Sequence, residues 1–254
     1  MTGSVSIGIH WLGHATVLVE DRARILTDPV LTGHVAHLRR RGGPLPEPLA
    51  GRVDAVVLSH LHLDHLHAPS LRLLDAGTPV LVPRGGGRLL RRTALEVVEV
   101  AVGDVVPVGD ATVTVVPAVH VNSRWPGSRL RADTVGYVVR GEGTTYFAGD
   151  TSLFPEMADV AGSPDVALLP VGGWGPSRGA HHMDPEDAAT CLSTLGASVA
   201  VPIHYGTLWP WGMSRVRNRL FQDPGHEFAQ RAWARAAHVD VRVLAPGDAT
   251  TVRL

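Results

Sequence analysis

Short apolar runs, ending in Gly, Pro, His or Asp, dominate the first half of the chain. Alternating apolar and polar positions rich in β-branched residues predict strands, and the continuous run at 55–58 is typical of a strand buried on both faces. We expect strands at residues 5–11, 16–20, 23–28, 55–58, 78–83, 96–100 and 112–120. Helices are expected at 68–77, where Pro69 and Gly77 mark a start and an end, and briefly at 85–93.

The second half repeats this order of strands first and helices later. Residues 134–140 and 144–150 predict a hairpin around a Gly-Glu-Gly turn. The strongest helix signal lies at 183–196, because Asp184 is a good N-cap, Pro185 suits the first helical position, Asp187 completes a capping pair and Gly196 ends the helix. Further strands are expected at 165–172, 198–206 and 241–247, and further helices at 153–160 and 226–238.

The order of elements predicts an α/β protein with one domain over residues 1–254. Neither half contains a clear linker or a low-complexity segment, and the Pro/Gly-rich stretch 39–51 is interpreted as a surface loop. Two similar mixed halves with buried strands favour an αββα sandwich, in which two mixed β-sheets pack face to face and helices cover both outer faces.

Composition narrows the classes of function. The net charge is −1, and all 23 basic residues are Arg, so neither a Schiff base nor a lysine general base is available. A net charge this close to zero does not demand a nucleic-acid partner. The single cysteine, Cys191, is interpreted as a buried apolar residue, and neither a signal peptide nor a membrane span is evident. We expect a cytoplasmic protein that acts on a small molecule without stable membrane association.

The segment LSHLHLDHLH, residues 58–67, contains four histidines and an aspartate in ten positions. A period of two in an extended chain places His60 and His62 on one side, with Leu61 and Leu63 facing away. Asp64 and His65 follow where the strand has ended. Imidazole and carboxylate groups are good ligands for zinc and similar divalent ions.

Three more residues of ligand type follow apolar strands elsewhere in the chain, namely His120, Asp150 and His204. The carboxyl ends of strands are where open α/β sheets usually bind ligands. Seven such residues exceed the four that a closed structural zinc site uses. The alternatives at this point are a site with two ions, a site with one ion, and histidines that merely form hydrogen bonds in a core.

HLHLDH followed by His120, Asp150 and His204, in that order, resembles the metallo-β-lactamase fold superfamily over nearly the whole chain. The stretches WLGHATVLVE, LTDPV, HHMDPEDA and PIHYGT resemble the branch that contains L-ascorbate-6-phosphate lactonase and the N-acyl-phosphatidylethanolamine phospholipase D type enzymes. The resemblance implies two divalent ions, the first held by His60, His62 and His120, the second by Asp64, His65 and His204, with Asp150 bridging them. Zn suits this ligand set best, and Mn or Fe also suit it.

The function that this resemblance implies is a dinuclear metal-dependent hydrolase. A water between two ions loses a proton near neutral pH and attacks a carbonyl carbon or a phosphorus atom, so a small phosphodiester or a lactone or ester is the expected substrate. Asp64 or a second water would supply the proton for the leaving group. The alternatives are a nuclease of the same fold, di-iron redox chemistry, and a protein that binds metal only for stability.

Other residues have two interpretations each. His14 either contacts the site or forms a turn, and Asp28 either accepts the second N–H of a ligand histidine or forms a simple Asp-Pro turn. His182, beside the strongest helix, is expected to contact substrate or transition state, because a helix N-terminus favours negative charge. The alternative is a histidine that only belongs to the capping region of this helix.

Two more expectations concern the surroundings of the site. His181 and His67 are expected at the surface without a role. The segment 206–221, with Trp209, Trp211 and three arginines, is expected to form a wall of the substrate pocket.

Overall fold

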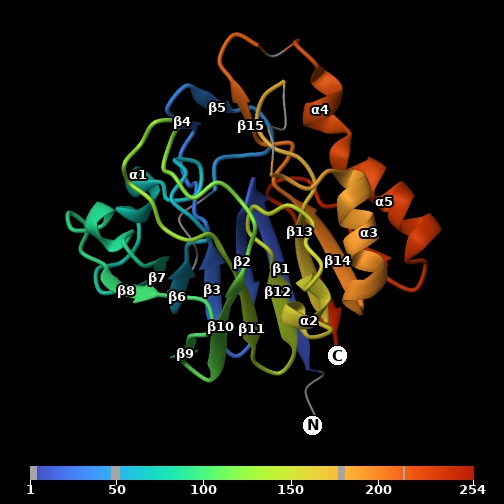
Figure 1. The fold of residues 1–254 in the computed structure, drawn as a ribbon, viewed down its shortest axis with the longest axis horizontal. Coiled ribbons are helices and arrows are strands. Elements are labelled where there is room, and N and C mark those ends of the chain that lie inside the picture. Colours follow the sequence, from blue (N-terminus) through green and yellow to red (C-terminus); the bar gives the residue numbers. More distant parts are fainter. Residues whose placement is uncertain (1–4, 47–51, 177–180, 214) are drawn as a thin grey trace.

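Two β-sheets form the centre of the computed structural model, which describes residues 5–46, 52–176, 181–213 and 215–254 (Figure 1). The first sheet consists, in spatial order, of β17 (Ala249–Arg253), β1 (Ser6–Gly13), β2 (Thr16–Glu20), β3 (Arg24–Thr27), β6 (Ala55–Val57), β7 (Pro79–Pro83) and β8 (Glu96–Val100). The second consists of β16 (Asp240–Val241), β14 (Val199–Ile203), β13 (Val166–Pro170), β12 (Thr144–Phe147), β11 (Val135–Arg140), β10 (Ala111–Pro117) and β9 (Val105–Val108). Both sheets combine parallel and antiparallel pairs, so the prediction of two mixed sheets is confirmed.

The two sheets pack face to face across one apolar core. Residues of β1 alternate between buried and half-buried, and Ile7, Ile9 and Trp11 point into this core. Val113 and Val115 of β10 meet them from the second sheet. Strands β13 and β14 are buried throughout, because the sheet interior covers one face and helices cover the other.

Helices cover the two outer faces unequally. On the second sheet, α3 (Pro185–Leu195) and α5 (Pro224–Arg235) pack against each other, with α2 (Met157–Ala161) beside α3 (Figure 1). On the first sheet, the outer face is covered by the short α1 (Ala68–Leu71) and the 3-10 turn η1 (Gly87–Leu89). Leu71 and Leu90 belong to a second apolar cluster, separate from the core between the sheets. Helix α4 (Asn218–Gln222) precedes α5. The predicted αββα sandwich is therefore confirmed, with one thin outer layer.

Several elements differ from the prediction. The last strand is β17 rather than 241–247, because Pro246 lacks an N–H and Gly247 has a φ of 105° that turns the chain. Strand β17 then pairs with β1 at the other end of the sequence. A third small sheet of β15 (Leu208–Pro210), β5 (Leu38–Arg40) and β4 (His34–Val35) was not expected, and α1 is shorter than the predicted helix at 68–77.

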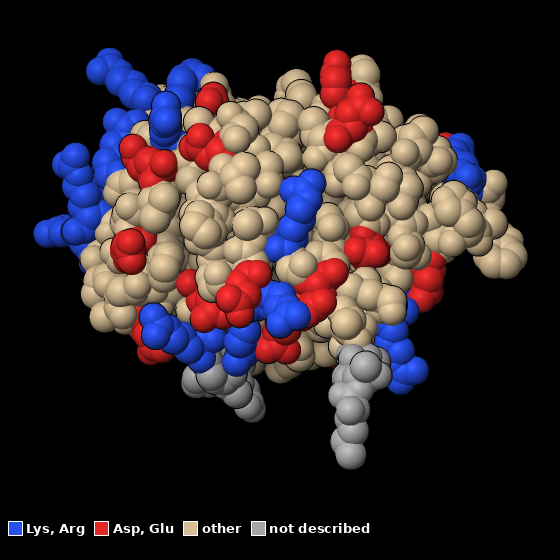
Figure 2. Space-filling model, turned by 90° about the horizontal axis from the view of Figure 1, so that it is seen from below, with Lys and Arg blue, Asp and Glu red and all other residues tan. Residues whose placement is uncertain are grey.

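Charge is mixed over much of the face seen in Figure 2, where acidic and basic side chains lie side by side. Basic side chains gather at the left edge, the side on which β8 and α1 lie in Figure 1. No described helix has the length and apolar character needed to cross a membrane. The absence of a nucleic-acid partner stays a prediction.

The start of α3 provides a test of the local sequence signal. The Asp184 side chain accepts hydrogen bonds from the backbone N–H groups of Glu186 (2.8 Å) and Asp187 (2.9 Å), in a capping box. We expect Asp184→Ala to lower the free energy of unfolding by about 1 kcal/mol, since two N–H groups lose their acceptor. Asp184→Asn retains an acceptor and should restore most of this loss in urea denaturation. Equal losses in both variants would contradict the capping role.

Candidate metal centre

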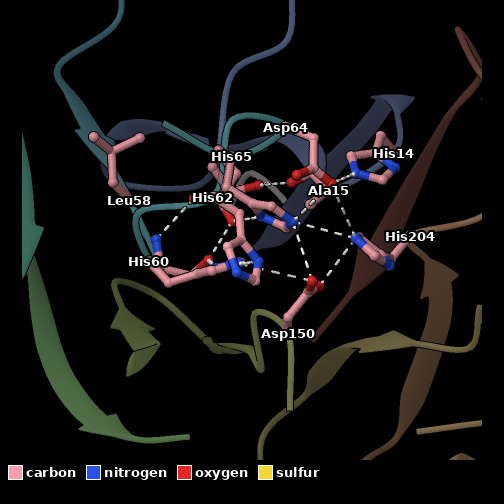
Figure 3. A network of polar contacts seen from close by, with 12 residues as sticks. His14, Ala15, Leu58, His60, His62, Asp64, His65, Asp150 and His204 are labelled. Carbon is pink, nitrogen blue, oxygen red and sulfur yellow. Dashed lines mark hydrogen bonds and ion pairs between the residues drawn. The ribbon is translucent and has the colours of Figure 1, made fainter. Parts of the chain in front are cut away.

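The candidate site is built from residues that lie shortly after the ends of strands of both sheets (Figure 3). Asp28 follows β3, and the histidine-rich segment 59–65 follows β6. Asp150 and His204 follow β12 and β14 of the second sheet. Glycine is required at position 149, where φ is 63° and a Cβ would lie 2.7 Å from the Cβ of Ser59. All seven predicted ligand residues therefore meet at one edge of the sandwich.

A first group of ligand atoms comes from His60, His62 and His120. The Nε2 of His60 lies 2.8 Å from the Nδ1 of His62, which lies 3.3 Å from the Nε2 of His120. The carboxylate Oδ2 of Asp150 is 3.9 Å from both of these Nε2 atoms. These four side chains can present one ligand atom each to a common point.

A second group lies on the other side of the same carboxylate. The Nε2 atoms of His65 and His204 are 3.2 Å apart. Oδ2 of Asp64 is 3.5 Å from the first and 3.8 Å from the second. Asp150 contributes Oδ2 at 3.2 Å from His65 and Oδ1 at 3.1 Å from His204, so its carboxylate faces both groups.

The outer hydrogen bonds of four imidazoles direct their Nε2 lone pairs into the cluster. The Nδ1–H of His60 donates to the Oγ of Ser59 (2.9 Å), and that of His65 donates to Asp28 (2.6 Å). The Nδ1–H of His120 donates to the carbonyl of His181 (2.8 Å), and that of His204 donates to the carbonyl of Gly172 (3.3 Å). A neutral imidazole that donates at Nδ1 has an acceptor at Nε2, which is the state that ligates a cation.

The spacing of these atoms fits metal ions. Ligands about 2.1 Å from a tetrahedral ion lie about 3.4 Å from one another, close to the separations in both groups. Two imidazole lone pairs repel when nothing lies between them. In addition, the buried Oδ1 of Asp150 has no hydrogen-bond donor among the described residues. The chemistry of the donor set therefore fits bound cations.

Burial and neighbouring charges shift the pKa values of the histidine and aspartate ligands. Burial lowers the pKa of His120 to about 4 and that of His60 well below its usual value, so both imidazoles are neutral near pH 7. Burial opposes ionisation of Asp150, but His204 and His65 lower its pKa well below the usual value. Burial alone would lower the pKa of His65, yet Asp150, Asp28 and Asp64 raise it well above normal. The excess negative charge is what a bound cation would compensate.

Asp28 has the orienting contact that was one of its two interpretations. Besides accepting from His65, its carboxylate accepts hydrogen bonds from the backbone N–H (2.7 Å) and hydroxyl (2.5 Å) of Ser59. Ser59 in turn holds His60. Sequence reasoning missed Ser59, although a hydroxyl directly before the first ligand histidine was the available signal.

His14 lies fully buried beside the second group. Its Nε2 is 2.8 Å from Oδ2 of Asp64, and its carbonyl accepts from the backbone N–H of His204 (2.9 Å). Its φ is 55°, and that of His204 is 63°, both in the left-handed region where non-glycine residues are strained. Of its two interpretations, the contact with the site is the one that the structure shows. Its Nδ1 lacks a hydrogen-bond partner in the described part of the chain, unlike the four imidazoles held from outside.

His182 lies at the mouth of the cluster. Its Nε2 is 3.2 Å from Oδ2 of Asp150, and its ring lines the pocket above that carboxylate. His181 is exposed as predicted, and its backbone carbonyl, not its side chain, contacts His120. The prediction that His67 lies at the surface is wrong. That side chain is buried against the hydroxyl of Ser70 (2.7 Å), since the first turn of α1 folds over it.

A pocket of about 670 Å³ opens onto the ligand groups. Its described lining comes from the β4–β5 region, Leu63, residues 121–126 and residues 173–176, together with the ligands. The expected wall at 206–221 is absent from this lining, because β15 pairs with β5 behind the pocket. Leu63 lines the pocket instead of facing away, since the chain after Ser59 turns and loses its period of two. Trp125 and Trp174, in the turn-rich NSRWPG and GGWGP stretches, were missed.

Two mixed sheets with a cluster of histidines and carboxylates at one edge define a metal-dependent hydrolase of the metallo-β-lactamase superfamily. The family profile of the "Beta-lactamase superfamily domain" matches residues 23–205. A "UPF0173 metal-dependent hydrolase" of Methanopyrus kandleri is 33% identical over 247 residues, covering 94% of this chain and 97% of that protein. The chain belongs to this superfamily and, within it, to the UPF0173 metal-dependent hydrolase family.

Solved structures show the same architecture. Igni18, described as a novel metallo hydrolase from Ignicoccus hospitalis, superimposes with a TM-score of 0.74 at 25% identity, covering 98% of this chain and 99% of that one. CmlA, a diiron β-hydroxylase from Streptomyces venezuelae, has a TM-score of 0.71 at 22% identity, and the match covers 100% of this chain and 55% of that one. The likeness to CmlA concerns the fold alone.

The contact between Asp28 and His65 gives a test that does not depend on activity. We expect Asp28→Ala to weaken metal binding about 10- to 100-fold, because His65 loses the acceptor that fixes its orientation. Competition with a chromophoric chelator measures the change. Asp54→Ala is the matched control, since Asp54 accepts a backbone hydrogen bond from Arg24 (2.8 Å) outside the site. Unchanged metal affinity in Asp28→Ala would remove Asp28 from the centre.

Proposed function

We propose that the protein is a dinuclear hydrolase that cleaves a small organic ester, lactone or phosphodiester. The observation that carries the proposal is the carboxylate of Asp150, which faces two separate groups of ligand atoms. His60, His62 and His120 would hold one divalent ion, Asp64, His65 and His204 the other, and Asp150 both. Two such ions, when bound, lower the pKa of water and polarise the scissile bond.

The chain itself contributes the orientation and the burial of the ligands. Ser59, Asp28 and the carbonyls of His181 and Gly172 hold the ligand imidazoles from outside. His14 holds the carboxylate of Asp64 through a 2.8 Å contact, so Asp64 faces its ligand group in a fixed rotamer. Most of the ligand side chains are buried, which strengthens the electrostatic interactions among them.

His182 is the side chain best placed to transfer a proton to the leaving group. Its ring lines the pocket, and its Nε2 lies 3.2 Å from Oδ2 of Asp150, within reach of a bond cleaved at that point. Asp64, the other candidate, is held by His14 and faces the second group of ligand atoms, a position that suits a ligand. This geometry favours His182 over Asp64 as proton donor.

Zinc is the proposed metal, because imidazole and carboxylate ligands without a thiolate suit it. Manganese and iron suit the same atoms, and the fold is shared with the diiron protein CmlA. The likeness to the lactonase and phospholipase D type branch stays a prediction. Elemental analysis of protein purified without added metal distinguishes the three metals.

Metal stoichiometry tests the two-ion arrangement. We expect wild-type protein dialysed after zinc loading to retain two ions per chain, and His120→Ala to retain about one, because His120 belongs to the first group alone. Asp150→Asn should weaken both sites. His226→Ala, an exposed histidine on α5, is the control and should match wild type. A wild-type content that saturates at one ion by plasma mass spectrometry would contradict the proposal.

The role of His182 predicts a different pattern. His182→Gln should lower kcat by about 10²–10⁴-fold, since an amide cannot supply the proton, while the metal content stays at the wild-type level. Substrates with a good leaving group, such as p-nitrophenolate, should lose less than alkyl substrates, because their leaving group needs no proton. An equal loss for both leaving groups would show that His182 acts in some other step.

A further inference from the structure

Polar and apolar groups are segregated within the pocket. The ligands and His182 form its floor, whereas its walls are mainly apolar and include Val35, Leu38, Leu63, Val121, Trp125 and Trp174. A volume of about 670 Å³ is larger than the reacting bond needs and accommodates a substrate of drug size. The part of a substrate beyond the scissile bond therefore contacts hydrocarbon and indole surfaces.

The two indoles are available for contact. Trp125 is 46% exposed and Trp174 is 36% exposed, although both line a concave surface. The ring of Trp174 is held edge-on by His37 at 5.2 Å, so its orientation is supported by a neighbour. Partly exposed aromatic side chains in a pocket gain most from an apolar ligand, because they bury a large area on binding.

The one arginine among the described lining residues is already occupied. Nη1 of Arg124 donates to the carbonyl of Leu61 (2.7 Å) and Nη2 donates to that of Leu66 (3.4 Å). The residue is 9% exposed, and its guanidinium holds the histidine-rich segment in place. A phosphate or carboxylate on the remote part of a substrate would be desolvated there without a free arginine among the described lining residues, which is unfavourable.

The absence of a free arginine from the described lining also bears on the scissile bond. Phosphoryl transfer spreads negative charge over several oxygens, which enzymes usually counter with arginine or lysine in addition to metal ions. Attack on a carbonyl develops charge on one oxygen, for which a single cation is sufficient. The described lining therefore suits a carbonyl centre better than a phosphorus centre.

We propose that the substrate is an uncharged carboxylic ester or lactone with an apolar substituent, which lies between Trp125 and Trp174. The proposal rests on the hydrolase function proposed above. In the reaction the oxygen of water bonds to the carbonyl carbon, the bond from that carbon to the alkoxy oxygen breaks, and the alkoxy oxygen takes up a proton. The products are a carboxylic acid and an alcohol, joined in one molecule when the substrate is a lactone.

A substrate series with one ring size tests the proposal on the full, zinc-loaded protein. The series consists of δ-valerolactone, δ-decalactone and 6-phosphogluconolactone, with bis-p-nitrophenyl phosphate as a phosphodiester. We expect kcat/KM for δ-decalactone to exceed that for δ-valerolactone at least about tenfold, because the pentyl group is buried against the walls. The phosphorylated lactone and the diester should be the poorest substrates.

Variants of the two pocket tryptophans test whether their indoles cause the preference for δ-decalactone. Trp125→Ala and Trp174→Ala should each lower kcat/KM for δ-decalactone about tenfold, with little change for δ-valerolactone and with the wild-type metal content. Trp233→Ala removes an exposed indole from α5, away from the pocket lining, and should change neither value.

The possible outcomes separate the two proposals. Turnover that favours the phosphorylated lactone or the diester would overturn the substrate assignment while supporting a hydrolase. Equal kcat/KM for the two uncharged lactones, or an equal loss for both in the tryptophan variants, would also overturn it. No turnover of any of the four by protein that holds its metal would count against the hydrolase function, and the substrate assignment would fall with it.

Discussion

Four hydrogen bonds that imidazole Nδ1–H groups donate outward are the interactions on which the centre depends. They leave the Nε2 lone pairs of His60, His65, His120 and His204 facing one another and facing Asp150. Lone pairs and buried carboxylates at such separations repel or remain unsatisfied unless cations lie among them. The same outer bonds that fix the tautomers thus create a site whose donor atoms suit bound cations.

The site forms only when both sheets are in place. Leu58 and Ser59, which lead from β6 into the histidine-rich segment, accept hydrogen bonds from the second sheet through the Tyr137 hydroxyl (2.8 Å) and the Val135 N–H (2.9 Å). His14 of the β1–β2 turn and His204 after β14 are joined by a backbone hydrogen bond. Their positive φ values are maintained because packing from both sides leaves no alternative, so folding of the sandwich and assembly of the ligand set are coupled.

Catalysis and selectivity are assigned to different parts of the pocket. The floor includes ligand residues and His182, which in the proposed function serve any substrate that polarised water can attack. The walls come from the β4–β5 hairpin, Leu63 and the loops at 121–126 and 173–176, and in the proposed function their indole and aliphatic surfaces select the substrate. Arg124 connects the two parts, because it lines the wall yet bonds to the carbonyl of Leu61 in the segment that carries the ligands. Because of this contact, a change at Arg124 would also affect the segment that carries the ligands.

The sequence by itself determined the elements that depend on neighbouring residues. The capping box at Asp184, the hairpin at 134–150 and the ligand-type residues after apolar strands are all local patterns, so the fold class and the seven candidate ligands could be predicted. Only the tertiary structure decided the pairing of β17 with β1, the contact of His14 with Asp64, and the indoles that line the pocket. These features join residues that are distant along the chain, and no local spacing encodes which distant side chain will lie opposite.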